Sequence, residues 1–281
     1  MISKEKFAIN RICPVIGVNR SSYYNWKNHP LNVDNNVYLR KEIQNIALEF
    51  PFYGYRRITH ELCRRKIIVN SKRVRKIMKE DNLICRRKKA FRPVTTDSNH
   101  SFKVYPNLTK NLKVTRLNQL WVSDITYIGL PNGFAYLATI IDVFSRKCIG
   151  WALSKEIDTL LTISALDMAI QKRWHIGLLD LIHHSDQGIQ YASDAYIERL
   201  NQFGIKISMS RKGNPYDNAF SESFNKTLKV EEVYINEYET FEDALKNIKH
   251  FIEIVYNKKR LHSSIGYVPP EEFEQEVLAK I

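Results

Sequence analysis

Cysteine is scarce in this chain of 281 residues, and long apolar runs are absent. The four cysteines, Cys13, Cys63, Cys85 and Cys148, are scattered without a CxxC pair, which argues against a zinc site and a disulfide framework. No apolar run approaches the roughly 18 residues that a membrane span needs, and the N-terminus lacks the apolar core of a signal peptide. We therefore expect a cytoplasmic protein without a membrane segment.

Acidic residues are scarce in the first part of the chain. Residues 1–116 hold 26 Lys and Arg but 8 Asp and Glu, a net charge of +18, whereas residues 117–281 hold 17 and 22, a net charge of −5. A charged but otherwise ordinary helical domain is the simpler explanation, yet an imbalance of this size favours a polyanionic partner. We therefore expect the first part to bind nucleic acid.

Residues 1–30 are predicted to form a first helix-turn-helix unit. Helices are expected over residues 4–12 and 21–26, the second entered from Asn19, with a turn over residues 14–17. Basic residues near the second helix, Arg20 among them, favour DNA contact. A plain pair of packed helices would show the same pattern.

Residues 31–90 are predicted to form a second basic helical region. A helix is expected over residues 39–50, and Ser71 is expected to cap a second helix that packs its apolar side inward. Cations on the other faces make that helix the candidate for DNA recognition: Lys72, Arg73, Arg75, Lys76 and Lys79. Four further cations either continue the DNA-binding track or form a solvated linker: Arg86, Arg87, Lys88 and Lys89. Residues 91–118 lack periodicity and are predicted to be an interdomain linker.

Residues 119–281 are predicted to form a mixed α/β domain. Strands are expected over residues 120–128, 134–143 and 146–153, with the hairpin signal Leu130-Pro131-Asn132-Gly133 between the first two. A helix over 158–174, a strand over 178–182, a helix over 193–203 and a strand over 205–209 follow. Two more helices are expected, one after Gly213-Asn214-Pro215 and one over 241–256.

Three carboxylates in this domain are candidates for one site. Asp124 is centred in an aromatic and β-branched run, and Asp186 follows a buried strand, where open α/β sheets place their sites. Glu222 lies on a helix opposite an apolar stripe of Phe220, Phe224 and Leu228. An acid on an exposed helix face is unremarkable alone, but three converging carboxylates repel one another unless cations neutralise them. Mg²⁺ suits such an all-oxygen site.

Five motifs occur in one order along the chain: Trp121-Val122-Ser123-Asp124-Ile125-Thr126-Tyr127, Ile141-Asp142-Val143-Phe144-Ser145-Arg146, His184-Ser185-Asp186-Gln187-Gly188, Asn214-Pro215-Tyr216-Asp217-Asn218-Ala219 with Glu222, and Tyr256-Asn257 through Arg260, His262, Gly266-Tyr267 and Pro269-Pro270. In these motifs the sequence resembles the DDE transposases with a retroviral-integrase-type core, and within them the second-frame product (OrfB) of bacterial insertion sequences. The resemblance implies an α/β, RNase-H-like mixed-sheet catalytic domain preceded by an all-α helix-turn-helix region. It also implies metal-dependent DNA strand cleavage and 3′-end joining by Asp124, Asp186 and Glu222.

The same resemblance implies partners and cofactors. Two Mg²⁺ ions are expected, with Mn²⁺ able to replace them and Asp124 bridging the two. The partners expected are the element's terminal repeats, target DNA, further copies of the chain on DNA, and the upstream-frame product (OrfA), either as a separate chain or as a frameshift fusion. Matching transposases carry a basic residue at the spacing of Lys229, which shares the helix face of Glu222 with Lys226, so both lysines are expected to contact DNA.

Several readings stay open at this point. Asp142 is expected to be structural, with Ser145 and Arg146 at a strand turn, rather than a fourth ligand. His184 either hydrogen-bonds near a strand end or touches DNA or metal, while Arg260 and His262 either contact DNA or hold the C-terminal tail. Two other functions are weighed against transposition. Another RNase-H-like nuclease is disfavoured because it would not require two basic helical modules, and a DNA-binding repressor is disfavoured because it would not require three carboxylates.

Overall fold

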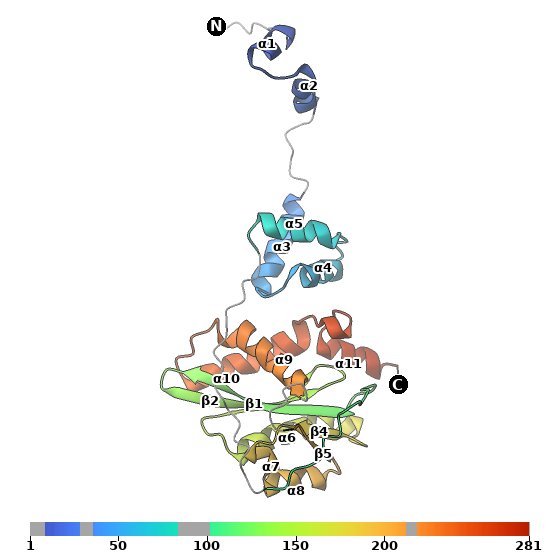
Figure 1. Cartoon of the computed structure of the whole chain (residues 1–281), viewed down its shortest axis with the longest axis vertical. Coiled ribbons are helices and arrows are strands. Elements are labelled where there is room, and N and C mark those ends of the chain that lie inside the picture. The colour runs from blue at the N-terminus through green and yellow to red at the C-terminus, as the bar shows by residue number, and fades with distance from the viewer. Residues whose placement is uncertain (1–8, 29–35, 84–101, 212–217, 281) are drawn as a thin grey trace. The chain divides into compact units, whose positions relative to one another are not determined.

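The computed structural model describes residues 9–28, 36–83, 102–211 and 218–280. The chain divides into two compact units, Met1–Ile84 and Cys85–Ile281, each of which is described by itself (Figure 1). No helix among the described residues is long and apolar enough to cross a membrane.

The first unit begins with two short helices in contact, α1 (Ile9–Val15) and α2 (Arg20–Asn28). The side chain of Asn19 accepts a hydrogen bond from the Ser21 N–H at 3.3 Å, so the expected entry into α2 is confirmed. Residues 9–12 are helical as expected, but α1 continues through Pro14 to Val15, where a turn was expected, and residues 4–8 lie outside the described residues. Proline has a backbone φ that a helix accepts, and its missing N–H costs a helix this short one hydrogen bond.

Three further helices form a small core of their own: α3 (Val37–Glu49), α4 (Tyr55–Arg64) and α5 (Ser71–Glu80). Their apolar stripes bury Leu39, Ile43, Ile46, Ile58, Leu62, Val74, Ile77 and Met78, as the periodicity predicts. The cap of α5 is Asn70 and not Ser71, because Asn70 has extended backbone angles and its side chain accepts from the Lys72 N–H at 2.8 Å. A capping residue must lie outside the helical conformation, and Ser71 is already inside it.

The second unit is built on a five-stranded mixed sheet in the order β3-β2-β1-β4-β5. The strands are β1 (Leu120–Leu130), β2 (Gly133–Asp142), β3 (Cys148–Ser154), β4 (Ile182–Ser185) and β5 (Lys206–Met209). The first three pair antiparallel, whereas β1, β4 and β5 run parallel. The expected hairpin and α/β architecture are confirmed.

The fourth strand begins later than the apolar run suggests. Residues 178–182 were expected to be a strand, but Leu179 and Asp180 form a turn, and Asp180 has a φ of +58°. Ile182 is the first residue of this run to pair with β1. Leu178 and Leu181 are buried in the core below the sheet. A short apolar run therefore indicated burial and not strand structure.

Helices cover both faces of the sheet (Figure 1). One core contains residues of α6 (Thr159–Arg173), α7 (Ile189–Ala192) and α8 (Asp194–Gln202). The short η1 (Trp174–Ile176) follows α6 and has no buried residue. The opposite core contains α9 (Ala219–Leu228), η3 (Lys229–Val233), α10 (Phe241–His250) and its π-helical continuation η4 (Phe251–Lys259). The short η5 (Ser263–Ile265) and α11 (Pro270–Leu278) complete the unit. The carboxyl end of β4 lies next to β1 in the sheet, and α9 packs on one face of β1.

Residues 102–118, expected to belong to a linker, instead pack against the second unit. Phe102 packs against one core of the sheet and Leu112 against the other, while Leu117 is buried. The Leu108 N–H donates to the Ser208 hydroxyl at 2.8 Å, which fastens this segment to β5. The segment has no strand or helix periodicity because it crosses the sheet as an extended chain. The rest of the expected linker, residues 91–101, lies outside the described residues.

The C-terminal segment is held by buried ion pairs. Glu274 of α11 pairs with Arg173 at the end of α6, and it also accepts from Lys147 at 3.0 Å. Arg260 forms a bidentate pair with Glu231, at 2.7 and 2.6 Å. The contacts of Glu274 fasten α11 to the end of α6 and to the turn before β3.

Candidate active site

Asp124 and Asp186 lie at equivalent positions on two adjacent parallel strands. Val122 of β1 is paired with His184 of β4, and each aspartate is two residues further along its own chain. Side chains two residues apart leave a strand on the same face. The two carboxylates therefore emerge side by side at the carboxyl end of β4, with Asp124 within β1 and Asp186 directly after β4.

A tight turn fixes Asp186. One oxygen of its carboxylate accepts a hydrogen bond from the Gly188 N–H at 3.0 Å. A β-carbon added at Gly188 would stand 3.0 Å from that same oxygen, which is closer than side chains normally allow. The glycine is required here for close approach, and its φ of −66° is ordinary. The motif His184-Ser185-Asp186-Gln187-Gly188 thus has a local structural reason.

Glu222 lies in the first turns of α9. Two asparagines, one before and one after Glu222 in the sequence, donate hydrogen bonds to β1. The side-chain amide of Asn218 donates to the Ser123 carbonyl at 3.0 Å, and that of Asn225 donates to the Asp124 carboxylate at 2.8 Å. Asn218 and Asn225 lie four residues before and three after Glu222, so all three share one side of the helix. Glu222 itself is exposed. The asparagines therefore fix the side of α9 that faces the aspartates.

The apolar stripe of α9 differs from the expected one at Phe220. Phe224 and Leu228 are buried as predicted, but Phe220 is 37% exposed, and the buried set also includes Ser221 and Asn225. The helix rotates its polar residues toward β1 because Asn218 and Asn225 have hydrogen-bond acceptors there. Sequence reasoning missed both asparagines, although their spacing from Glu222 was a usable signal.

The carboxylates repel one another. Burial raises the pKa of Asp124 to about 7, and the charges of Asp186 and, more weakly, Glu222 act in the same direction. The Asn225 amide and the Ile125 backbone N–H oppose the shift. A carboxyl group that is costly to ionise gains most from a nearby cation. The site therefore fits a hard divalent metal, whose preferred ligands are oxygens.

The three carboxylates do not yet form a closed ligand set. Among the described residues, no group of three His, Cys, Asp or Glu side chains lies close enough to hold an ion. The two aspartates and Glu222 are nevertheless near enough to shift the pKa of Asp124. Binding a metal through all three requires the exposed Glu222 side chain to approach the aspartates.

Lys229 lies within electrostatic reach of Asp124. Burial lowers the pKa of Lys229, whereas the charge of Asp124 raises it. The ammonium stands 3.8 Å from the centre of the Tyr127 ring, which follows Asp124 on the same strand, so it makes a cation–π contact beside the carboxylates. Lys226, one turn earlier on α9, is exposed.

The residues whose roles were left open have structural contacts. Asp142 is buried and accepts from the backbone N–H groups of Asn118, Phe144 and Ser145, at 2.9, 2.9 and 3.2 Å, which agrees with the structural role expected. The buried ring of His184 hydrogen-bonds to the Ser208 hydroxyl at 2.8 Å. His262 packs edge-on against Tyr256, and Arg260 is buried in its pair with Glu231. 

The expected DNA-contacting cations of the first unit are exposed where the structure describes them. Lys72, Arg75, Lys76 and Lys79 project from the outer faces of α5, and Arg20 is exposed at the start of α2. Arg73 is exposed but also donates to the Asn36 side chain at 2.9 Å, which links α5 to the start of α3. The tetrad formed by Arg86, Arg87, Lys88 and Lys89 lies outside the described residues.

The sheet order and the paired aspartates define an RNase-H-like core of the kind that acts on polynucleotides. Residues 114–215 and 203–270 match two family models described as integrase core domain, and residues 34–91 match one described as HTH-like domain. A 31 kDa protein of insertion element IS600 from Shigella sonnei is 40% identical over 94% of this chain and 97% of its own length. The transposase of insertion sequence IS904 from Lactococcus lactis is 41% identical over 79% and 87%. This chain belongs to the insertion-sequence transposases with an integrase core domain.

This membership confirms the resemblance drawn from the sequence motifs. The chain is a DDE-type DNA transposase, a polynucleotidyl transferase that acts in DNA transposition, and it binds DNA through its HTH-like and integrase core domains. Among solved structures, a simian T-cell lymphotropic virus intasome in complex with the PP2A regulatory subunit B56 gamma covers 83% of this chain and 73% of its own, at a TM-score of 0.47 and 17% identity.

Proposed function

We propose that Asp124, Asp186 and Glu222 are the catalytic carboxylates of this transposase and its metal ligands. The observation that carries the proposal is the pairing of Val122 with His184, which brings the two aspartates to one face of the sheet beside α9. The raised pKa of Asp124 supports it, because the arrangement is unfavourable without a neutralising cation. Glu222 completes the set by turning toward the aspartates.

The reaction is an in-line displacement at phosphorus: water breaks the P–O3′ bond at the element end and frees a 3′-hydroxyl, which then attacks a target phosphate and releases the 3′-oxygen of the target strand. Two bound Mg²⁺ ions, which Mn²⁺ can replace, would supply charge neutralisation and an acidified nucleophile. The chain's own residues position that chemistry. Asp124, on which the charges of both Asp186 and Glu222 act, would hold the metal together with them, while the Asn225 amide donates to one of its oxygens. No protein nucleophile is required.

Lys229 and Lys226 are proposed to contact the DNA strand at the reacting end. Lys229 is held beside Asp124 by its contact with the Tyr127 ring, so its ammonium can meet a phosphate next to the site. Lys226 lies on the exposed side of the same helix. Both positions place positive charge where the phosphate backbone must pass between α9 and the carboxylates.

The basic residues of the first unit are proposed to hold the element's terminal repeat. Their exposure on α5 and at the start of α2 supports this proposal, because phosphate contacts need solvent-accessible cations. The set is Arg20, Lys72, Arg73, Arg75, Lys76 and Lys79, together with Arg86, Arg87, Lys88 and Lys89 beyond the described residues. Arg73 contributes both to helix packing and to the basic surface.

We further propose that the chain acts in the cytoplasm, at the nucleoid when bound, as a homo-oligomer on DNA. The upstream-frame product is proposed as a partner or fused segment. The family membership supports these proposals, since insertion-sequence transposases must bring two element ends and a target together.

A strand-transfer assay tests the proposed function. A labelled duplex of the element's terminal repeat is incubated with target plasmid and the purified chain, with and without the upstream-frame product, in Mg²⁺, Mn²⁺ or EDTA. We expect 3′-end cleavage and joining with either metal and none in EDTA. Cleavage without joining under every condition would favour a plain nuclease. DNA binding without cleavage would favour a repressor.

A further inference from the structure

A pocket opens next to the carboxylates on the same face of the sheet. It has a volume of about 550 Å³, within the range of ligand-binding pockets. Leu120 and Val122 of β1 form part of its wall. Leu120, Val122 and Asp124 are spaced two residues apart, so their side chains share one face of the strand. Val122 is about 7 Å from Asp124 along the strand. Phe220, two residues before Glu222, forms the adjoining wall.

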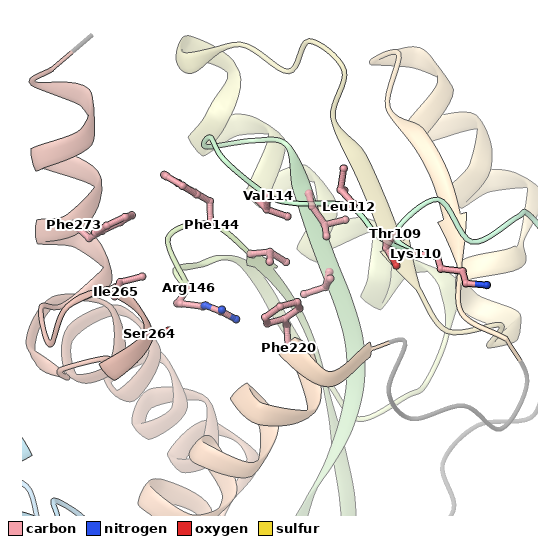
Figure 2. A pocket seen from close by; sticks show the side chains of 13 residues that line it. Thr109, Lys110, Leu112, Val114, Phe144, Arg146, Phe220, Ser264, Ile265 and Phe273 are labelled. Carbon is pink, nitrogen blue, oxygen red and sulfur yellow. The ribbon is translucent and has the colours of Figure 1, made fainter. Parts of the chain in front are cut away.

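Lys110 lines the pocket from the segment before β1, and Arg146 lines it from the β2–β3 turn. Its guanidinium lies over the Phe220 ring, 4.2 Å from the ring centre, as Figure 2 shows. Within the described part of the chain no carboxylate pairs with Arg146, and its buried Nε has no hydrogen-bond partner. A half-buried guanidinium without an anion is costly, and burial lowers the pKa of Arg146. The surroundings of Arg146 therefore favour a ligand that is anionic or that accepts hydrogen bonds.

The backbone at Arg146 gives a second reason to assign the side chain a function. Its φ is +65°, a left-handed conformation that favours glycine or asparagine over arginine. The turn itself is held by backbone and neighbouring groups, because the Arg146 N–H donates to the Asp142 carbonyl at 2.8 Å. Because glycine would suit this turn better, we attribute the presence of arginine to a function of its guanidinium.

The rest of the lining is mixed, because Thr109, Lys110 and Ser264 are polar whereas the other residues are apolar. Leu112 and Val114 come from the segment before β1, while Phe144 and Phe273 form a second aromatic group with ring centres 5.5 Å apart (Figure 2). A ligand that fits must have a flat, largely apolar body and an edge rich in acceptors or negative charge. A nucleotide has both: its base can stack on Phe220 and its phosphate or base edge can meet Arg146.

We propose that this pocket binds one unstacked nucleotide of the DNA strand next to the scissile phosphate. The proposal rests on the proposed strand-transfer function, because it requires DNA to cross the carboxylates. The pocket lies beside them along β1, at a separation that a neighbouring nucleotide can span. Unstacking a base costs a few kcal/mol. Stacking on Phe220 and contact with the Arg146 guanidinium offset that cost and fix the strand in register.

Photocrosslinking tests the proposal directly. A single 5-iodouracil is moved one position at a time through the nucleotides on each side of the cleavage site of a terminal-repeat duplex, with Ca²⁺ in place of Mg²⁺. The full chain is irradiated and the crosslinked peptide is identified by mass spectrometry. We expect one position to crosslink to Phe220. The same duplexes are tested for cleavage in Mg²⁺, so that the pocket and the proposed function are scored separately.

Matched variants separate the pocket from general folding effects. Phe220→Leu and Arg146→Gln should each weaken binding of the terminal-repeat duplex about fivefold or more, the size expected for the loss of one base–aromatic stack. Arg199 and Phe203 form a similar pair elsewhere in the unit, at 4.9 Å, so Arg199→Gln and Phe203→Leu should leave binding unchanged. An abasic nucleotide at the crosslinked position should weaken wild-type binding and have no further effect on Phe220→Leu.

Two outcomes would overturn the inference, and a third would overturn the proposed function alone. Cleavage by the wild type with no crosslink to Phe220 at any position would remove the pocket while leaving the proposed function intact. Loss of self-association in sedimentation by Phe220→Leu and Arg146→Gln, with DNA binding unchanged, would assign the pocket to a second copy of the chain. A crosslink to Phe220 without cleavage or joining would instead keep the pocket and refute the proposed function.

Discussion

Replacing Asp124 by asparagine should stabilise the metal-free protein while abolishing its activity. The pKa of Asp124 is raised from 3.8 to about 7 in the folded chain, mainly by burial and then by the charge of Asp186. Roughly three pKa units at about 1.4 kcal/mol each correspond to about 4 kcal/mol of unfavourable free energy when the group is ionised. Local relaxation reduces this, so we expect a gain of about 2–4 kcal/mol from the neutral side chain at about pH 8.

The pH dependence of this gain has a defined sign. Below about pH 4 the carboxyl is protonated in both the folded and the unfolded chain, so Asp124 costs nothing. Between pH values of about 4 and 7 the unfolded chain ionises first, and the cost of Asp124 grows with pH. Above about pH 7 the cost is constant. The stabilisation of Asp124→Asn should therefore appear as pH rises from about 4 to 7 and vanish at lower pH.

Thermal unfolding in EDTA across this pH range measures the effect. A gain of about 2–4 kcal/mol corresponds to a rise in Tm of roughly 5 °C or more for a domain of this size. Asp167, which pairs with Arg199 at 2.7 Å on the surface, is the matched control. Asp167→Asn should change stability by less than about 1 kcal/mol, and in the opposite direction. A lower Tm for Asp124→Asn at about pH 8, or a gain that is independent of pH, would refute the reasoning.

Three further predictions concern other parts of the chain. Lys229→Ala should impair joining of terminal repeats much more than folding or nonspecific DNA binding. The control, Lys246→Ala on the exposed face of α10, should have little effect. Equal activity of the two variants in a strand-transfer assay would remove Lys229 from the site. Residues 1–101 alone should bind DNA with a slope of log K against log salt of roughly −5 or steeper, because several phosphates are neutralised, and a flat response would exclude that role. Glu274→Leu should cost about 3–5 kcal/mol in denaturant unfolding, because it leaves the buried Arg173 without its anion; a smaller loss would mean that Lys147 and not Arg173 is its main partner.

The parts of the fold that follow local rules were predictable from sequence. The hairpin between β1 and β2 is specified by Pro131-Asn132-Gly133, and the helices α3, α6 and α10 by apolar periodicity. Asp186 was placed correctly at the carboxyl end of a strand even though the strand itself was set too early. An aspartate that follows a buried strand is a local signal, whereas the strand's first residue is decided by where β1 offers a partner.

The features that depend on tertiary contacts were not predictable in the same way. The segment containing Leu112 and Leu117 lacks periodicity, so nothing in its pattern shows that it crosses the sheet. The asparagines that orient α9 bond to β1 about a hundred positions away in the sequence, at Ser123 and Asp124. Phe220 is not buried with the apolar stripe, because its ring contacts Arg146. Only the folded chain brings these two residues together.

The most direct test of the proposed site is the strand-transfer assay applied to three single variants: Asp124→Asn, Asp186→Asn and Glu222→Gln. The carboxylates are proposed to hold one metal site as a unit, so each variant should lose cleavage and joining, and double variants should lose no more than single ones. Terminal-repeat binding should be equal to wild type or tighter. Joining within about tenfold of wild type by any one variant would contradict the assignment of that residue.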